Sequence, residues 1–127
     1  MPHSEYPSGS GCICMSGSEY SLKWLSDRYG RTNDNLSLKF NFAAGSSGNE
    51  PGVTPASDIS YSITGLEEIY KLCGETRLWG GMHYTASVQG AFDLCQGIGD
   101  MGYEYATNLE TGDGTLGFGA TADYPDP

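Results

Sequence analysis

Apolar residues at helical spacing predict a long first helix over residues 8–29. The pattern repeats every three or four positions, as expected when one face of a helix packs against a core. Ser8 or Ser10 can cap the N-terminus of this helix, and Gly30 can end it. The positions that follow the spacing are Cys12, Met15, Glu19, Leu22 and Leu25.

Apolar and polar side chains alternate strictly over residues 36–42. A period of two is typical of a short strand or extended segment that is half buried on one side. Residues 45–57 are rich in Gly, Ser and Pro and are expected to form a long loop. The apolar members of the alternation are Leu36, Leu38, Phe40 and Phe42.

Helical spacing returns over residues 65–72, which Gly74 is expected to end, and over residues 87–107. The second of these segments is predicted to be one continuous helix. Its interior glycines each cost about 1 kcal/mol relative to alanine. We therefore expect them to allow close packing against another helix. They are Gly90, Gly97, Gly99 and Gly102.

Together these segments predict a mainly α fold, a partial helical bundle with one short extended segment and long loops. Residues 1–109 are expected to form this helical domain. Residues 110–127 are acidic and rich in Gly, contain no basic residue, and are predicted to be a loose tail.

The charge balance excludes two classes of partner. Six Lys and Arg residues stand against 16 Asp and Glu residues, which gives a net charge of −10. Such a chain repels polyanions at long range, so neither nucleic acid nor an anionic membrane surface is expected as a partner. No run of about 18 apolar residues predicts a membrane span, and no signal-peptide core follows Met1.

The four cysteines, Cys12, Cys14, Cys73 and Cys95, do not have the spacing of a zinc site. Free buried thiols are the simplest interpretation. Disulfides are the alternative, and their pairing does not follow from the sequence.

Two segments carry candidate chemistry. Residues 7–11, PSGSG, lead into the first helix, where free N–H groups and the helix dipole attract an oxyanion. Gly9 would let the backbone approach this anion and Ser8 would add a hydroxyl donor, although ordinary helix capping explains the same residues. In residues 76–87, Arg77 offers a planar cation and His83 a nucleophile or metal ligand. A surface arginine and a hydrogen-bonded structural histidine are the alternative.

The segments PHSEYPSGSG and RLWGGMH resemble the HPxYPSGH and R-x5-H motifs of one superfamily. The order and spacing of the intervening residues are also similar. Over residues 2–108, the chain resembles the C-terminal half of the vanadium-dependent haloperoxidase / type 2 phosphatidic acid phosphatase superfamily, in its chloroperoxidase-like branch.

This resemblance implies that His83 coordinates vanadate, with Arg77, the Ser8 hydroxyl and the Gly9 N–H as oxyanion donors. Hydrogen peroxide and halide would then be the substrates. The phosphatase variant of the same site would use His83 as a nucleophile on a phosphate ester. The resemblance also implies an extracellular location.

The chain departs from the family pattern at three points. Ser10 stands where the family has its acid/base histidine, and serine has no group that titrates near neutrality. Ser87 stands where the superfamily often has aspartate, and the K-x6-RP segment does not occur in these residues. A haloperoxidase-like enzyme and a non-catalytic structural or interaction module therefore both remain open. The missing half leaves two interpretations open: another protein or a second copy supplies the missing helices, or the chain is a truncated product, a fragment or a diverged copy that uses the fold differently.

Overall fold

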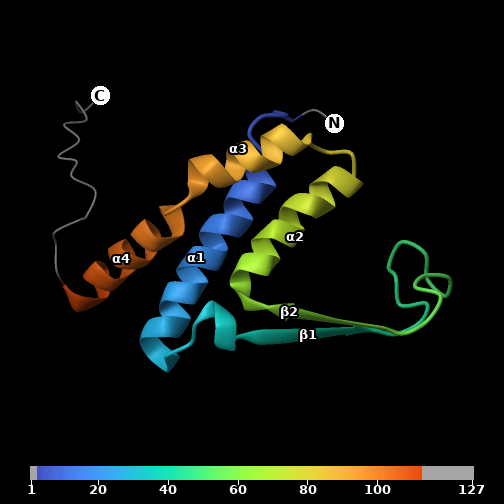
Figure 1. Cartoon of the computed structure of the whole chain (residues 1–127), viewed down its shortest axis with the longest axis horizontal. Helices are drawn as coiled ribbons and strands as arrows, with labels where there is room; N and C mark the ends of the chain where they lie inside the picture. The colour runs from blue at the N-terminus through green and yellow to red at the C-terminus, as the bar shows by residue number, and fades with distance from the viewer. Residues whose placement is uncertain (1–2, 113–127) are drawn as a thin grey trace.

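The computed structural model describes residues 3–112 and shows a mainly helical chain with one two-stranded sheet (Figure 1). The predicted mainly α fold class is therefore confirmed. None of the helices in this range is long and apolar enough to cross a membrane. The elements are α1 (Gly9–Tyr29), η1 (Asn33–Asn35), β1 (Ser37–Phe42), β2 (Ile59–Thr64), α2 (Gly65–Trp79), α3 (Thr85–Cys95) and α4 (Ile98–Thr111).

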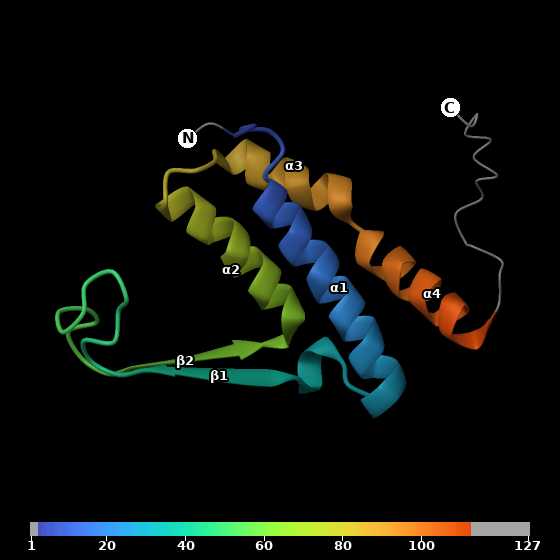
Figure 2. The same ribbon diagram turned by 180° about the vertical axis from the view of Figure 1, so that it is seen from behind.

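Helix α1 is the central element, with α2 on one side and α4 on the other, and α3 crosses the N-terminal end of α1 and reaches α2 (Figures 1 and 2). Its predicted limits are confirmed. The Ser8 hydroxyl accepts a hydrogen bond from the Gly11 N–H at 3.3 Å, and Gly30 ends the helix in the left-handed conformation with φ 62°. The buried apolar side chains of the described residues are few: Met15, Ile63, Leu66, Val88, Ala91, Cys95 and Tyr103.

The extended segment is confirmed as β1, which pairs antiparallel with β2, a strand that the sequence did not predict. Ile63 is buried opposite Leu38, but Phe40 and Phe42 are 41% and 50% exposed. The expected half-buried face is therefore wrong for most of β1. The reason is that the ribbon leads away from the helices toward the loop that joins its strands (Figures 1 and 2).

Helix α2 is longer than predicted and continues through Gly74 to Trp79. Gly74 is buried, and a Cβ atom there would lie 2.6 Å from Cγ1 of Val88 and 2.7 Å from Cζ of Phe92. Gly74 therefore allows α3 to pack closely against α2, and it does not end α2. Arg77 is thereby placed in the last turn of a helix.

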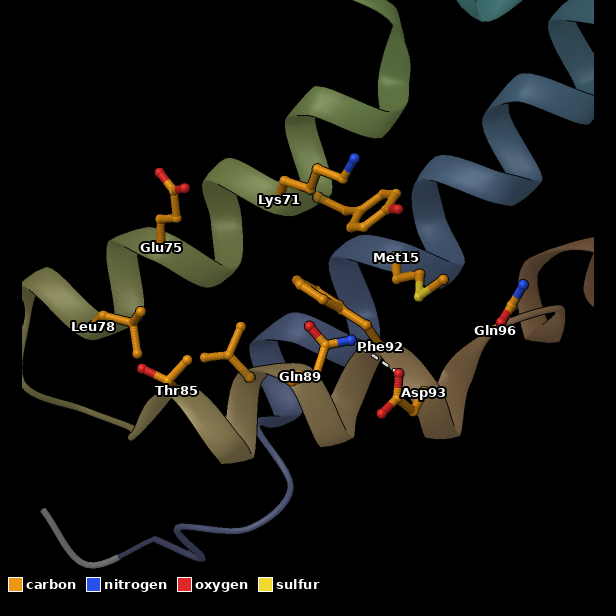
Figure 3. Close-up of a pocket in the computed structure, with 11 residues that line it drawn as sticks. Met15, Lys71, Glu75, Leu78, Thr85, Gln89, Phe92, Asp93 and Gln96 are labelled. Atoms are coloured by element: carbon orange, nitrogen blue, oxygen red, sulfur yellow. Dashed lines mark hydrogen bonds between the residues drawn. The ribbon is translucent and has the colours of Figure 1, made fainter.

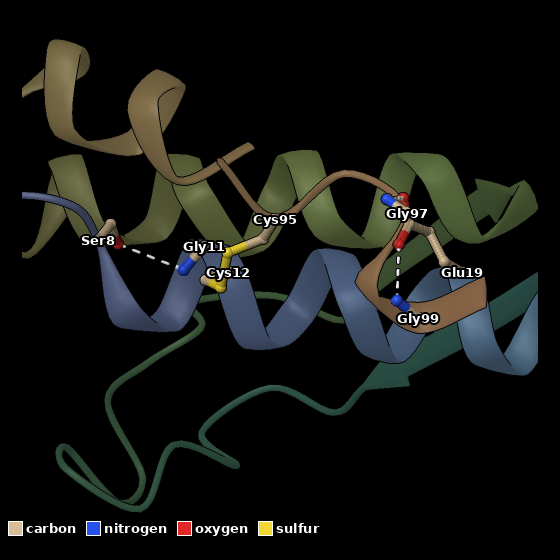
Figure 4. Close-up of a disulfide and its surroundings, with 7 residues drawn as sticks. All are labelled: Ser8, Gly11, Cys12, Glu19, Cys95, Gly97 and Gly99. Carbon is tan, nitrogen blue, oxygen red and sulfur yellow. Dashed lines mark hydrogen bonds between the residues drawn. A yellow bond between two sulfur atoms is a disulfide. The ribbon is translucent and has the colours of Figure 1, made fainter. Parts of the chain in front are cut away.

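The third predicted helix is two helices, because the chain breaks at Gly97, whose φ is 84°. The two carboxylate oxygens of Glu19 on α1 accept hydrogen bonds from the Gly97 and Gly99 N–H groups at 2.9 and 3.0 Å (Figure 4). Glu19 thus caps α4 from another helix and stabilises the break. Helix α4 then runs to Thr111, and residues 113–127 of the predicted tail lie outside the described residues.

The glycines of this segment have different roles. A Cβ atom on Gly99 would overlap the Ser16 carbonyl oxygen and the Glu19 Cβ of α1, as expected for close helix packing. Gly90 instead faces the ring of Tyr6, which does not belong to a helix. Gly102 has only an ordinary contact with Tyr20, at 3.7 Å.

Gly99→Ala is expected to lower the free energy of unfolding by about 1–3 kcal/mol, because the new methyl group overlaps α1 backbone. Gly17→Ala is the matched control, since Gly17 lies on α1 and nothing stands within 4 Å of its Cβ position. That control should raise stability by about 0.5–1 kcal/mol. Urea denaturation measures both values, and equal effects would contradict the packing role of Gly99.

All four cysteines are paired, so free thiols were the wrong interpretation and the disulfide alternative holds. Cys12 on α1 is bonded to Cys95 at the end of α3, and Cys14 on α1 is bonded to Cys73 on α2 (Figure 4 shows the first bond). Their Cα atoms lie 5.4 and 6.4 Å apart, within the range of disulfides. The first turns of α1 are thereby cross-linked to α2 and α3.

Candidate functional site

The segment before α1 lies against the start of α3, so residues far apart in the sequence meet there. The Ser8 N–H donates to the Ser87 carbonyl oxygen at 2.9 Å. Further upstream in the same segment, the Glu5 carbonyl oxygen lies 2.7 Å from Nδ1 of His83. These contacts bring the PSGSG segment and the His83 segment side by side.

The PSGSG residues differ in what they offer an anion. Ser8 is fully buried and caps α1, which uses an acceptor lone pair of its hydroxyl and not the O–H itself. Gly9 is exposed, and no atom lies within 4 Å of its Cβ position. Ser10 is half-buried in the first turn. Capping and anion binding are thus compatible at this helix start.

Arg77 is half-buried, and its Nε atom is buried without a hydrogen-bond partner. Leaving a buried donor unpaired costs about 1–3 kcal/mol, and more for a charged group. An acceptor at this position would therefore be stabilising. The Arg77 carbonyl oxygen accepts from the Met82 N–H at 2.9 Å, which links the end of α2 to the residue before His83.

The His83 side chain is only 3% exposed. Because a carbonyl oxygen can only accept, the contact with Glu5 makes Nδ1 the donor of the ring and leaves Nε2 with the lone pair of a ligand or nucleophile. The ring also lies beside that of His3, with centroids 4.9 Å apart. The adjoining hollow measures about 370 Å³ and is lined by His3, Glu5, Leu78, Gly81, Met82, His83 and Tyr84.

Glu5 is a residue of this site that the sequence reasoning missed. One carboxylate oxygen of Glu5 accepts from the Tyr84 N–H at 2.8 Å and from the Ser87 hydroxyl at 2.5 Å. The Ser87 bond, and after it the Tyr84 bond, lowers the pKa of Glu5 below its usual value, against an opposing effect of desolvation. One signal in the sequence could have pointed to Glu5. Ser87 stands where the superfamily often has aspartate, so the carboxylate at this place had to come from another residue.

The structure brings Glu5, Ser8, His83 and Ser87 together, but the hydrogen bond and ring contact described for His83 are made with Glu5 and His3, not with Arg77 or Gly9. Arg77, Ser8 and Gly9 are not among the residues that line the hollow beside His83. Convergence of Ser8, Gly9, Arg77 and His83 on one anion therefore stays a prediction.

A larger hollow of about 510 Å³ lies between α2 and α3 (Figure 3). Phe92 and Met15 contribute apolar surface to it, and Lys71, Glu75 and Asp93 contribute charge. None of the predicted site residues lines it, so size alone does not identify the candidate site.

Within residues 3–112, no three His, Cys, Asp or Glu side chains are grouped to hold a metal ion. The site implied by the resemblance does not need such a group, because it holds an oxyanion through one histidine nitrogen and several hydrogen-bond donors. Whether these residues can hold an oxyanion therefore depends on Arg77 and His83.

Comparisons with known proteins agree with the fold. A family model described as the VCPO second helical-bundle domain matches residues 1–112. The crystal structure of a holo-type bacterial vanadium-dependent chloroperoxidase is similar with a TM-score of 0.73 and 32% sequence identity, over 85% of this chain and 22% of its own. The apo-type structure gives 0.75 and 33%, over 87% and 23%.

The chain thus spans about a fifth of the length of these chloroperoxidases. No curated protein sequence matches it. The family model nevertheless covers most of the chain, and both solved structures share about a third of its residues over the aligned part. The chain therefore belongs to the family of the second helical-bundle domain of vanadium chloroperoxidase.

Proposed function

We propose that this chain holds vanadate in a haloperoxidase-like protein, with His83 as the coordinating residue. The observation that carries the proposal is the buried Nε atom of Arg77, which has no acceptor among the described residues. An oxyanion would supply that acceptor. Arg77, the Ser8 hydroxyl and the Gly9 N–H would bind its oxygens, and Nε2 of His83 would be the ligand.

These residues fit vanadate in their chemistry. The guanidinium supplies a permanent positive charge, and the start of α1 adds N–H groups and a helix dipole. The hydrogen bond from Nδ1 of His83 to the Glu5 carbonyl oxygen leaves Nε2 as the ring nitrogen that can bind vanadate. Vanadate, when bound, would supply the activation of hydrogen peroxide for halide oxidation.

The chain's net charge of −10 opposes anion binding at long range, so the local donors must outweigh it. Further cationic groups and helices would come from another polypeptide or a second copy. Large apolar side chains support this need for a partner, since several are mostly exposed. They include Ile13 at 74%, Leu94 at 65% and Leu109 at 56%.

Vanadate titration tests the proposal. Arg77→Ala is expected to weaken vanadate binding about 10- to 100-fold, because it removes a charge-assisted contact of roughly 1.5–3 kcal/mol. Arg31→Ala is the control, since Arg31 is exposed and lies outside the site. Vanadium NMR at constant ionic strength measures the affinity of each variant, and a bromide and peroxide assay measures turnover.

Two results would contradict the proposal. One is the absence of vanadate binding in the chain alone and also with the remaining half of a family member added. The other is equal affinity in Arg77→Ala and the unchanged chain. Turnover of a phosphate ester that vanadate inhibits would instead assign the phosphatase variant, with Nε2 of His83 as nucleophile.

One observation favours a non-catalytic module as the second candidate. Ser10 offers no acid or base near neutral pH at the position where the family has histidine. In that case the fold would be retained for assembly with a partner.

A further inference from the structure

We propose that Glu5 is a positioning residue for His83, fixing the ring through its backbone carbonyl and the start of α3 through its carboxylate. The inference deepens the proposed function, on which its relevance to vanadate rests. Neither the family match nor the motifs assign a role to Glu5.

The first argument is the incomplete cap of α3. Its N-cap residue, Tyr84, makes no side-chain hydrogen bond to the helix. In a capping box, a carboxylate at the third helical position accepts from the N-cap N–H. That position is Ser87 here, and the carboxylate comes instead from Glu5, which accepts from the Tyr84 N–H at 2.8 Å and the Ser87 hydroxyl at 2.5 Å.

The second argument is the contact with the imidazole. The Glu5 carbonyl oxygen accepts from Nδ1 of His83 at 2.7 Å, and the Glu5 carboxylate lies 3.9 Å from the same nitrogen. One residue therefore contacts His83 itself and the two positions, Tyr84 and Ser87, that fix the following turn. Partners of this kind orient a ligating histidine and select which ring nitrogen faces the ligand.

The third argument is that the carboxylate can be removed without detaching the segment. The Ser8 N–H remains bonded to the Ser87 carbonyl oxygen at 2.9 Å, and Ser8 remains the cap of α1. Glu5 is itself exposed. A truncated side chain should therefore leave the fold in place and loosen only the Tyr84 and His83 positions.

The experiment compares Glu5→Ala, the double variant Glu5→Ala/Ser87→Asp and the control Glu104→Ala, which changes an exposed glutamate on α4. Two readouts need no vanadate: amide exchange at Tyr84, and the tautomer of His83 from long-range nitrogen–proton NMR at one fixed pH. The third readout is the affinity for vanadate.

Glu5→Ala keeps the carbonyl oxygen that accepts from Nδ1 of His83 but removes the carboxylate that holds residue 5 against Tyr84 and Ser87. Because the carbonyl oxygen is then held less firmly, the variant is expected to speed exchange of the Tyr84 amide, to mix the two tautomers of His83 and to weaken vanadate binding about 10- to 100-fold. Ser87→Asp should restore all three, because it returns a carboxylate to the third position of α3. Glu104→Ala should change none.

Unchanged Tyr84 exchange and an unchanged His83 tautomer in Glu5→Ala would overturn the inference, whatever happens to vanadate. Absence of vanadate binding in every variant would overturn the proposed function instead. The two vanadate-free readouts would then still decide whether Glu5 positions His83.

Discussion

Replacement of Cys12 and Cys95 by alanine is expected to lower the free energy of unfolding by about 3 kcal/mol. The bond joins residues 83 positions apart, but Cys14–Cys73 stays closed in this variant, so the unfolded chain gains freedom mainly between residues 73 and 95. Loss of that constraint raises the chain entropy of the unfolded state and so favours unfolding. The cross-linked helices α1 and α3 would remain joined only by noncovalent contacts.

This loss is a large fraction of the total, since domains are typically stable by only about 5–15 kcal/mol. The buried apolar core is small, with Ala91 at 0% and Cys95 at 2% exposure among its few members. Small cores commonly depend on disulfides for this reason.

Urea denaturation with and without a thiol reductant measures the effect. The reduced wild-type chain should unfold at a lower urea concentration than the oxidised one, and the double variant should fall between them because it keeps Cys14–Cys73. Coincident unfolding curves in the presence and absence of reductant would contradict a stabilising role for the disulfides.

Ser10→His is expected to raise vanadate-dependent halide oxidation by about 10²–10⁴-fold, the usual contribution of a positioned acid/base group. Ser10 is half-buried in the first turn of α1, one residue after Gly9, so an imidazole would start from the same turn as the proposed oxyanion donors. The prediction assumes that the remaining cationic groups are supplied by an added family half.

Ser10→Gln is the matched control, because glutamine resembles histidine in size but does not titrate. Bromination of a dye is measured for both variants at saturating vanadate. A gain in Ser10→His alone would identify the missing acid/base group. Equal rates in both variants, with vanadate bound, would favour the non-catalytic module.

Local signals made α1 predictable from the sequence, since Ser8 and Gly30 cap it with bonds inside their own segment. Gly74 and Gly97 show where such reasoning stops. The first lies inside a helix because Val88 and Phe92 approach it, and the second separates two helices because Glu19 caps the break. Those contacts depend on tertiary packing, which the local sequence does not contain.

The same limit applies to the candidate site. Its motif residues Ser8, Arg77 and His83 were found through their spacing and resemblance to a family. Glu5 was missed because its partners, Tyr84 and Ser87, lie 79 and 82 positions away. The disulfide pairing could not be predicted for the same reason, because a C-x-C pair and two distant cysteines do not reveal which helices will face one another.

The disulfides also set an order on the maturation of the chain. Cys12 and Cys14 are made before their partners, which follow 83 and 59 positions later. Because synthesis proceeds from the N-terminus, the thiols of Cys12 and Cys14 are at first without their partners. Cys73 then becomes available before Cys95. Cys14 therefore has its partner available while α3 is still emerging, before the partner of Cys12 has been made.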